Sequence, residues 1–75
     1  MHIDEEIDLV GMVTPLCFLY LKKALEGLKR GEVLQVLVGE AAIAQSIEMI
    51  IERSSDHLVD RRRRGDIQSI LIRKG

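Results

Sequence analysis

The sequence has few of the residues on which many functional sites depend. Its 75 residues include one cysteine, one proline, one tyrosine, one phenylalanine and no tryptophan. A single cysteine excludes an internal disulfide framework and is typical of a reducing compartment. The scarcity of aromatic side chains predicts an aliphatic core and leaves little for stacking on nucleic-acid bases.

Long hydrophobic runs and a large charge imbalance are also absent. The longest charge-poor run, residues 10–21, is too short to span a bilayer and is interrupted by Gly11 and Pro15. The first eight residues carry four acidic side chains where a signal peptide would have a basic region. We therefore expect a cytoplasmic protein with no membrane segment. A formal net charge of -1 gives no general nucleic-acid signature.

The composition is that of a folded domain, with 47% hydrophobic and 31% charged residues. We expect one domain over residues 1–75, and a chain of this size buries only about 60 to 65% of its unfolded surface. Hydrophobic periodicity predicts the element order strand, helix, strand, helix, strand, strand. The strands are expected at 3–9, 32–38, 57–62 and 67–73, with a turn near Arg64-Gly65-Asp66, and the helices at 14–31 and 41–53.

This order predicts an α/β (α+β) two-layer sandwich, in which two helices cover one face of a four-stranded mixed sheet. In the first helix Cys17 falls on the apolar stripe, and Leu19 falls among the charged residues of the opposite side. The other side chains expected to face the core are Phe18, Leu21, Leu25, Leu28, Leu34, Val36, Val38, Ile70 and Ile72. The pattern also groups Ile3, Ile7 and Leu9 on one side of the first strand, and Ile43, Ile47, Ile50 and Ile51 along one side of the second helix.

The first helix has a recognisable start and end. Thr14 is a favourable N-cap residue, whose hydroxyl would accept a hydrogen bond from the amide of Leu16 or Cys17. Pro15 suits the first helical position, and Gly31 follows the last basic residues. If Thr14 caps the helix, its replacement by alanine costs about 1 kcal/mol.

The region before this helix resembles a known family. Asp8, Gly11 and Pro15 match the pattern D-x-x-G-x-x-C-P-x-P of the TusA or SirA-like sulfur carriers. Later segments agree at matching spacing: Lys22-Lys23-Ala24-Leu25, Gly31-Glu32, His57 and Ile70-Leu71-Ile72-Arg73-Lys74. In that family the motif cysteine carries a persulfide sulfur and hands it to another protein. The resemblance therefore implies a sulfurtransferase-like role, with protein partners in a sulfur relay.

The motif cysteine itself is replaced. C-P-x-P reads Thr14-Pro15-Leu16-Cys17, so a threonine stands at the carrier position. A hydroxyl cannot do this chemistry, because the carrier must attack as a thiolate and then hold a second sulfur. Cys17 is the only candidate carrier. Its position in the first helical turn favours an accessible thiolate, whereas its place in the apolar stripe favours a buried structural thiol.

Two other functions remain open. The chain could be a non-catalytic module that binds a partner through residues 14–20, with the motif turn and Leu19 as the contact residues; the candidates are Asp8, Gly11, Thr14, Pro15 and Leu19. Alternatively, a basic patch could bind RNA or an acidic protein: Arg61, Arg62, Arg63 and Arg64. His57 has no neighbours at metal-site spacing, so we expect no metal and no cofactor. The oligomeric state is left open.

Overall fold

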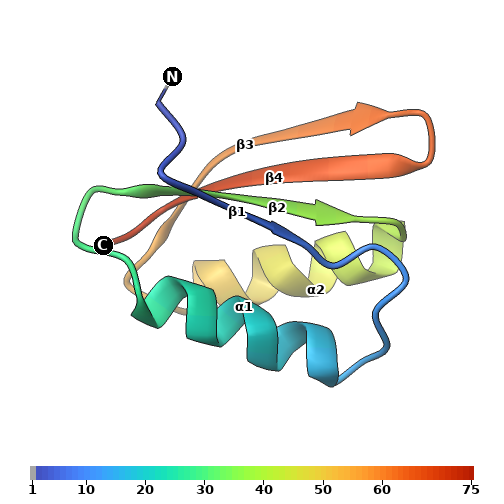
Figure 1. Ribbon diagram of the computed structural model, residues 1–75, viewed down its shortest axis with the longest axis horizontal. Coiled ribbons are helices and arrows are strands. Elements are labelled where there is room, and N and C mark those ends of the chain that lie inside the picture. Colours follow the sequence, from blue (N-terminus) through green and yellow to red (C-terminus); the bar gives the residue numbers. More distant parts are fainter. Residues whose placement is uncertain (1) are drawn as a thin grey trace.

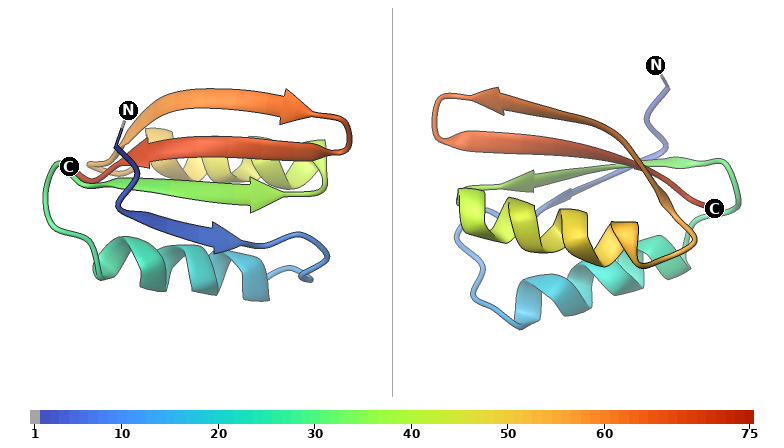
Figure 2. Two further views of the ribbon diagram at one scale, coloured as in Figure 1. Left: turned by 45° about the horizontal axis from the view of Figure 1, so that its top comes forward. Right: turned by 180° about the vertical axis from the view of Figure 1, so that it is seen from behind.

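The computed structural model describes residues 2–75 and has the predicted order of elements. They are β1 (Glu5–Asp8), α1 (Leu16–Glu26), β2 (Val33–Val38), α2 (Ala41–Glu52), β3 (His57–Arg64) and β4 (Ile67–Arg73) (Figure 1). The strands form one sheet, and both helices lie against the same face of it (Figure 2). The predicted two-layer α+β sandwich is confirmed.

The sheet is mixed, with the strand order β1-β2-β4-β3. β1 and β2 are parallel, so the chain must cross over between them, and α1 forms this crossover. β4 is antiparallel to β2 on one side and to β3 on the other. The last strand in the sequence is therefore an interior strand.

The core lies between the sheet and the two helices. Leu34, Val36 and Val38 alternate along β2, and all three are fully buried, as are Ile70 and Ile72 on β4. They pack with buried residues of both helices: Cys17, Leu21, Leu25, Ala44, Ile47 and Ile51. The predicted inward face of each central strand is thus correct.

The first helix is shorter than predicted. α1 ends at Glu26, with Gly27 as its C-cap, because glycine in a helix interior costs about 1 kcal/mol relative to alanine. Gly31 lies in the following turn with a φ of 88°, and its amide donates to the carbonyl oxygen of Lys74 at 2.8 Å. This bond joins the turn to the end of β4.

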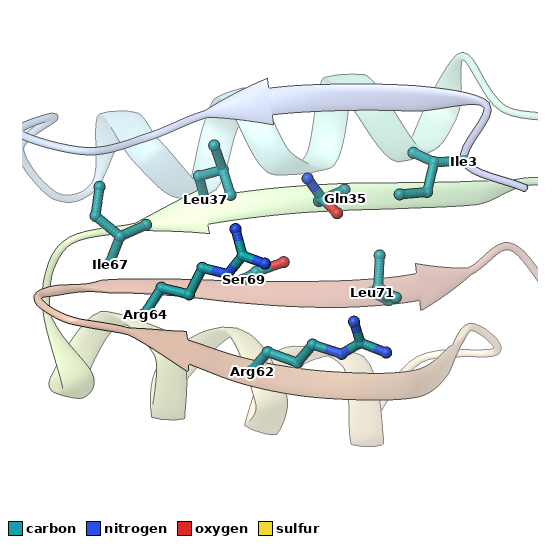
Figure 3. Close-up of a pocket in the computed structure, with 8 residues that line it drawn as sticks. All are labelled: Ile3, Gln35, Leu37, Arg62, Arg64, Ile67, Ser69 and Leu71. Carbon is teal, nitrogen blue, oxygen red and sulfur yellow. The ribbon is translucent and has the colours of Figure 1, made fainter. Parts of the chain in front are cut away.

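Two apolar side chains do not follow the side on which the pattern grouped them into the core. Ile3 precedes β1 and lines the same hollow as Leu71 on the sheet face away from the helices (Figure 3). Ile50, on α2, is 42% exposed, because the neighbouring Ile47 and Ile51 already fill the contact with the sheet. β3 is also two residues longer than predicted and reaches Arg64.

No helix in the described part of the chain combines the length and hydrophobicity that a membrane span requires.

Candidate functional site

The motif residues lie in the connection between β1 and α1. This connection is at the end of the sheet where the parallel strands β1 and β2 finish and where both helices begin (Figure 1). Ligands of α/β folds commonly bind at the carboxyl ends of parallel strands. This end of the molecule is therefore the candidate site.

The start of the connection is a fixed turn. Asp8 Oδ1 accepts a hydrogen bond from the amide of Val10 at 2.9 Å, and the amide of Met12 donates to the carbonyl of Leu9 at 3.1 Å. Gly11 has a φ of 78°, a conformation that side chains disfavour, although a Cβ there would meet no atom within 4 Å. Asp8 thus shapes the turn through its carboxylate, and Gly11 does so through its backbone conformation.

The predicted cap of α1 is wrong. The helix begins at Leu16 with Pro15 as its N-cap residue, and the Thr14–Pro15 peptide bond is cis. Within residues 2–75, no side chain caps this helix. The amide of Cys17 was predicted to be a possible donor to the Thr14 hydroxyl. It donates instead to the carbonyl oxygen of Val13 at 3.1 Å. Thr14 is exposed beside the helix start and makes no capping bond.

Cys17 is buried. Of the two alternatives that the sequence left open, an accessible thiolate and a buried structural thiol, the structure has the second. The side chain of Cys17 is free of any disulfide and 0% exposed, and it belongs to the main hydrophobic cluster. The position of Cys17 on the apolar stripe of α1 thus determines its environment, and its place in the first helical turn does not make it accessible. No thiol sulfur is accessible at the candidate site in this structure.

Exposed apolar side chains surround the start of α1. We call Val13, Leu16, Leu19 and Tyr20 the entry surface; Val13 is 69% and Leu19 60% exposed. Leu16, Leu19 and Tyr20 are three and four positions apart, so they share one side of the helix. Leu19 is exposed as predicted, whereas the exposure of Val13 and Leu16 was not predicted from the sequence.

Two hollows adjoin this surface. One separates the motif turn from the start of α2, and its lining includes Thr14, Phe18 and Ile43. The other runs between the helices and is mostly apolar, with Pro15, Leu19 and the exposed Ile50 in its lining. The contribution of α2 could not be read from the sequence, because it depends on how the two helices sit side by side.

The four arginines do not form one patch. Alternation along β3 sends Arg62 and Arg64 to the face away from the helices (Figure 3), as expected for an extended strand. Arg61 lies on the helix side, where it pairs with Glu48 of α2 at 2.8 Å. Arg63 Nε donates to the carbonyl of Gly65 at 3.1 Å.

The histidines also stay apart from the candidate site. His57 is exposed at the start of β3, and His2 contacts Asp4 at 2.9 Å. Among residues 2–75, no group of three or more histidine, cysteine, aspartate and glutamate side chains could hold a metal ion. The site therefore consists of backbone turns and mostly apolar side chains, with the exposed Thr14 and Tyr20 as its hydroxyl-bearing residues and Glu40 and Ser46 in the adjoining hollow.

Comparison with known proteins finds relatives of this chain by fold and by sequence. The crystal structure of a SirA-like protein from Desulfitobacterium hafniense superposes with a TM-score of 0.72 at 26% sequence identity. The match covers 95% of this chain and 97% of that one. No curated protein sequence matches the chain. The model of the sulfurtransferase TusA family matches residues 5–74, and the chain therefore belongs to that family.

Proposed function

We propose that this protein acts in a sulfur relay as a protein-binding component that docks through the entry surface. One contrast carries the proposal: Cys17 is 0% exposed, whereas Leu19, two positions later, is 60% exposed. Membership of the TusA family supports a role in sulfur transfer with protein partners. The proposal assigns the protein to the cytoplasm, where a lone cysteine stays reduced.

The entry surface has the properties of a docking site. Its apolar side chains stand on a rigid helix start, so little conformational freedom is lost when a partner covers them. Leu19 and Tyr20 can serve as anchors, and the apolar hollow between the helices can receive a side chain of the partner. This geometry favours a protein partner over a small ligand.

Burial argues against sulfur carriage on Cys17. The Cys17 thiolate would have to attack the outer sulfur of a donor persulfide. A new S–S bond would form, the S–S bond of the donor would break, and the donor would leave as a thiolate. A thiolate among aliphatic side chains lacks solvation, and a donor needs access to the sulfur.

Sulfur carriage remains the second candidate, because family membership and the position of Cys17 in the first turn of α1 favour it. It requires the motif turn to open. The two candidates differ in how fast Cys17 reacts in the native state.

Thiol labelling tests this difference. We expect a maleimide probe to modify native Cys17 much more slowly than the denatured chain, at a rate that follows unfolding. Incubation with a low-molecular-weight persulfide should then add no sulfur atom to Cys17 by mass spectrometry. Native labelling as fast as in denaturant, together with an added sulfur atom, would establish the carrier and reject the docking proposal in this form.

A genetic test addresses the surface. In a strain that depends on this protein for a sulfur-dependent phenotype, Cys17→Ala should retain function and Leu19→Ser should lose it. Leu58→Ser is the matched control, because Leu58 is an exposed apolar residue on β3, outside the entry surface. Loss of function in a folded Cys17→Ala protein, with Leu19→Ser unaffected, contradicts the proposal.

A further inference from the structure

The sheet face away from the helices has a regular charge pattern. Glu6 lies on this face, since its Oε2 accepts from Gln35 Nε2 at 3.0 Å, and Asp8 shares the face by alternation. Arg62 and Arg64 lie on the same face at the opposite edge, on β3 (Figure 3). We call Glu6 and Asp8 the acidic margin, and Arg62 and Arg64 the basic margin.

One row of paired residues joins the acidic margin to the basic margin, whereas the row that starts at Glu6 ends at Asp60. Asp8 is opposite Leu37, Leu37 is opposite Ser69, and Ser69 is opposite Arg62. The floor between the margins is slightly hollowed and uncharged, and its lining mixes Leu37, Ile67 and Leu71 with the polar Gln35 and Ser69. An acidic edge, an uncharged floor and a basic edge therefore follow one another across the four strands.

The basic margin keeps a positive balance after its internal contacts are counted. Asp60 Oδ2 accepts from Arg62 Nε at 2.8 Å and offsets one of the two positive charges. No hydrogen bond or ion pair joins the Arg64 side chain to any other residue of the described chain. The guanidinium of Arg64 thus has its donors available for a carboxylate from outside.

We propose that this open face is a self-association surface, on which two copies pack about a twofold axis parallel to the strands. That rotation places β1 of one copy against β3 of the other, so the acidic margin meets an edge on which Arg62 and Arg64 outnumber Asp60, with Asp8 level with Arg62 and Glu6 level with Asp60. A twofold axis across the strands would instead place acid against acid and base against base. The charge pattern selects the first arrangement, which is isologous and closes as a dimer.

The size of the face sets the strength of the dimer. The four strands contain 4, 6, 8 and 7 residues. At about 3.3 Å per residue and about 4.8 Å between strands, they cover about 400 Å² per copy. Interfaces of this size belong to the weak, transient class. Salt should weaken the contact, because exposed charges at its rim contribute much of the selectivity. The entry surface lies on the other side of the molecule and stays accessible in such a dimer.

Charge reversal provides the test, with sedimentation velocity of the full chain as the readout. We expect a concentration-dependent dimer at low salt that weakens about tenfold or more at high salt. The variant Glu6→Lys/Asp8→Lys and the variant Arg62→Glu/Arg64→Glu each carry like charges on both margins, so each should be monomeric. Mixed in equal amounts, they should form a heterodimer, since every margin then meets its opposite.

Controls separate this interface from folding defects and other contacts. Lys23→Glu and Glu52→Arg change exposed charges on the helices and should leave the dimer intact. Lysine at position 8 could perturb the turn, so a second variant is needed. Glu6→Gln/Asp8→Asn retains an acceptor for the Val10 amide, and its dimer must still be weaker than that of the wild type. A wild type that is monomeric at millimolar concentration, folded variants that fail to pair, or open-ended oligomers each overturn the proposal.

Discussion

At the scale of single residues, the motif turn separates two roles that one side chain combines in the family pattern. Thr14 keeps the exposed position beside the helix start, and Cys17 keeps the sulfur but is fully buried. The exposed residue, Thr14, and the residue with the thiol, Cys17, are therefore about one helical turn apart. Because one residue is exposed and the other is buried, substitutions at the two positions should change the free energy of unfolding by different amounts.

Replacement of Cys17 should cost stability, whereas replacement of Thr14 should not. Cys17→Ala removes one buried heavy atom, and we expect a loss of about 0.5 to 1.5 kcal/mol, similar to other small core deletions. Thr14→Ala should change the free energy of unfolding by less than about 0.5 kcal/mol, because Thr14 is exposed and caps nothing. Urea denaturation of both variants measures the difference. A larger loss of stability for Thr14→Ala would indicate that Thr14 caps α1 after all.

Asp60 should titrate below its ordinary range. The hydrogen bond from Arg62, followed by the amide of Arg61, lowers the pKa of its carboxyl. A lowered folded-state pKa means that the stabilisation is present above the unfolded pKa and is lost as the pH falls through the folded one. Carbon-detected NMR titration should show the low pKa and its return toward the ordinary value in Arg62→Gln. An unchanged Asp60 pKa in that variant would remove Arg62 as the cause.

At the scale of elements, one side chain joins three of them. Arg61 on β3 donates to Gln68 Oε1 on β4 through Nε at 3.0 Å, and its Nη1 pairs with Glu48 on α2 at 2.8 Å. Gln68 is 7% exposed and is the one buried polar residue among the described residues. The hairpin β3–β4 is thus tied to the second helix through a polar contact beside the apolar core.

Removal of Arg61 should therefore affect stability more than removal of its neighbour. Arg61→Ala leaves the buried oxygen of Gln68 without its donor, and we expect a loss of about 1 to 2 kcal/mol. Arg63→Ala is the matched control and should cost less than about 0.5 kcal/mol, because Arg63 is exposed and contacts only the turn. Equal thermal denaturation curves for the two variants would argue against the contact with Gln68.

At the scale of the whole molecule, the sheet has a single covered face. The helices lie on one side of the sheet (Figure 2). The open face carries the two charged margins. Neighbouring residues of one strand can therefore differ widely in their contribution to stability.

Leu34 and Leu37 on β2 show this difference. Leu34→Ala opens a cavity in the core and should cost about 2 to 5 kcal/mol. Leu37→Ala, on the open face, should cost less than about 1.5 kcal/mol when measured on the monomer, because the side chain is only partly covered. Denaturant midpoints at low protein concentration test this, and similar costs would mean that the open face is covered even in the monomer.

Much of this architecture could be predicted from the sequence. Alternation along β2 and β4, the apolar stripe on each helix and the resemblance at Asp8, Gly11 and Pro15 were sufficient for the fold and the family. The start of α1 was not predicted, because a backbone carbonyl of the preceding turn takes the amide assigned to Thr14. The hollow between the helices was also missed, since it arises from contacts between segments far apart in the chain.

The strand order has a consequence for biosynthesis. β4 is the last strand to be translated, and it lies between β2 and β3 and supplies the fully buried Ile70 and Ile72. Until β4 leaves the ribosome, β2 and β3 have no common neighbour, and the core lacks Ile70 and Ile72. The nascent chain therefore completes its fold only after translation of β4, and chaperones can bind it until then.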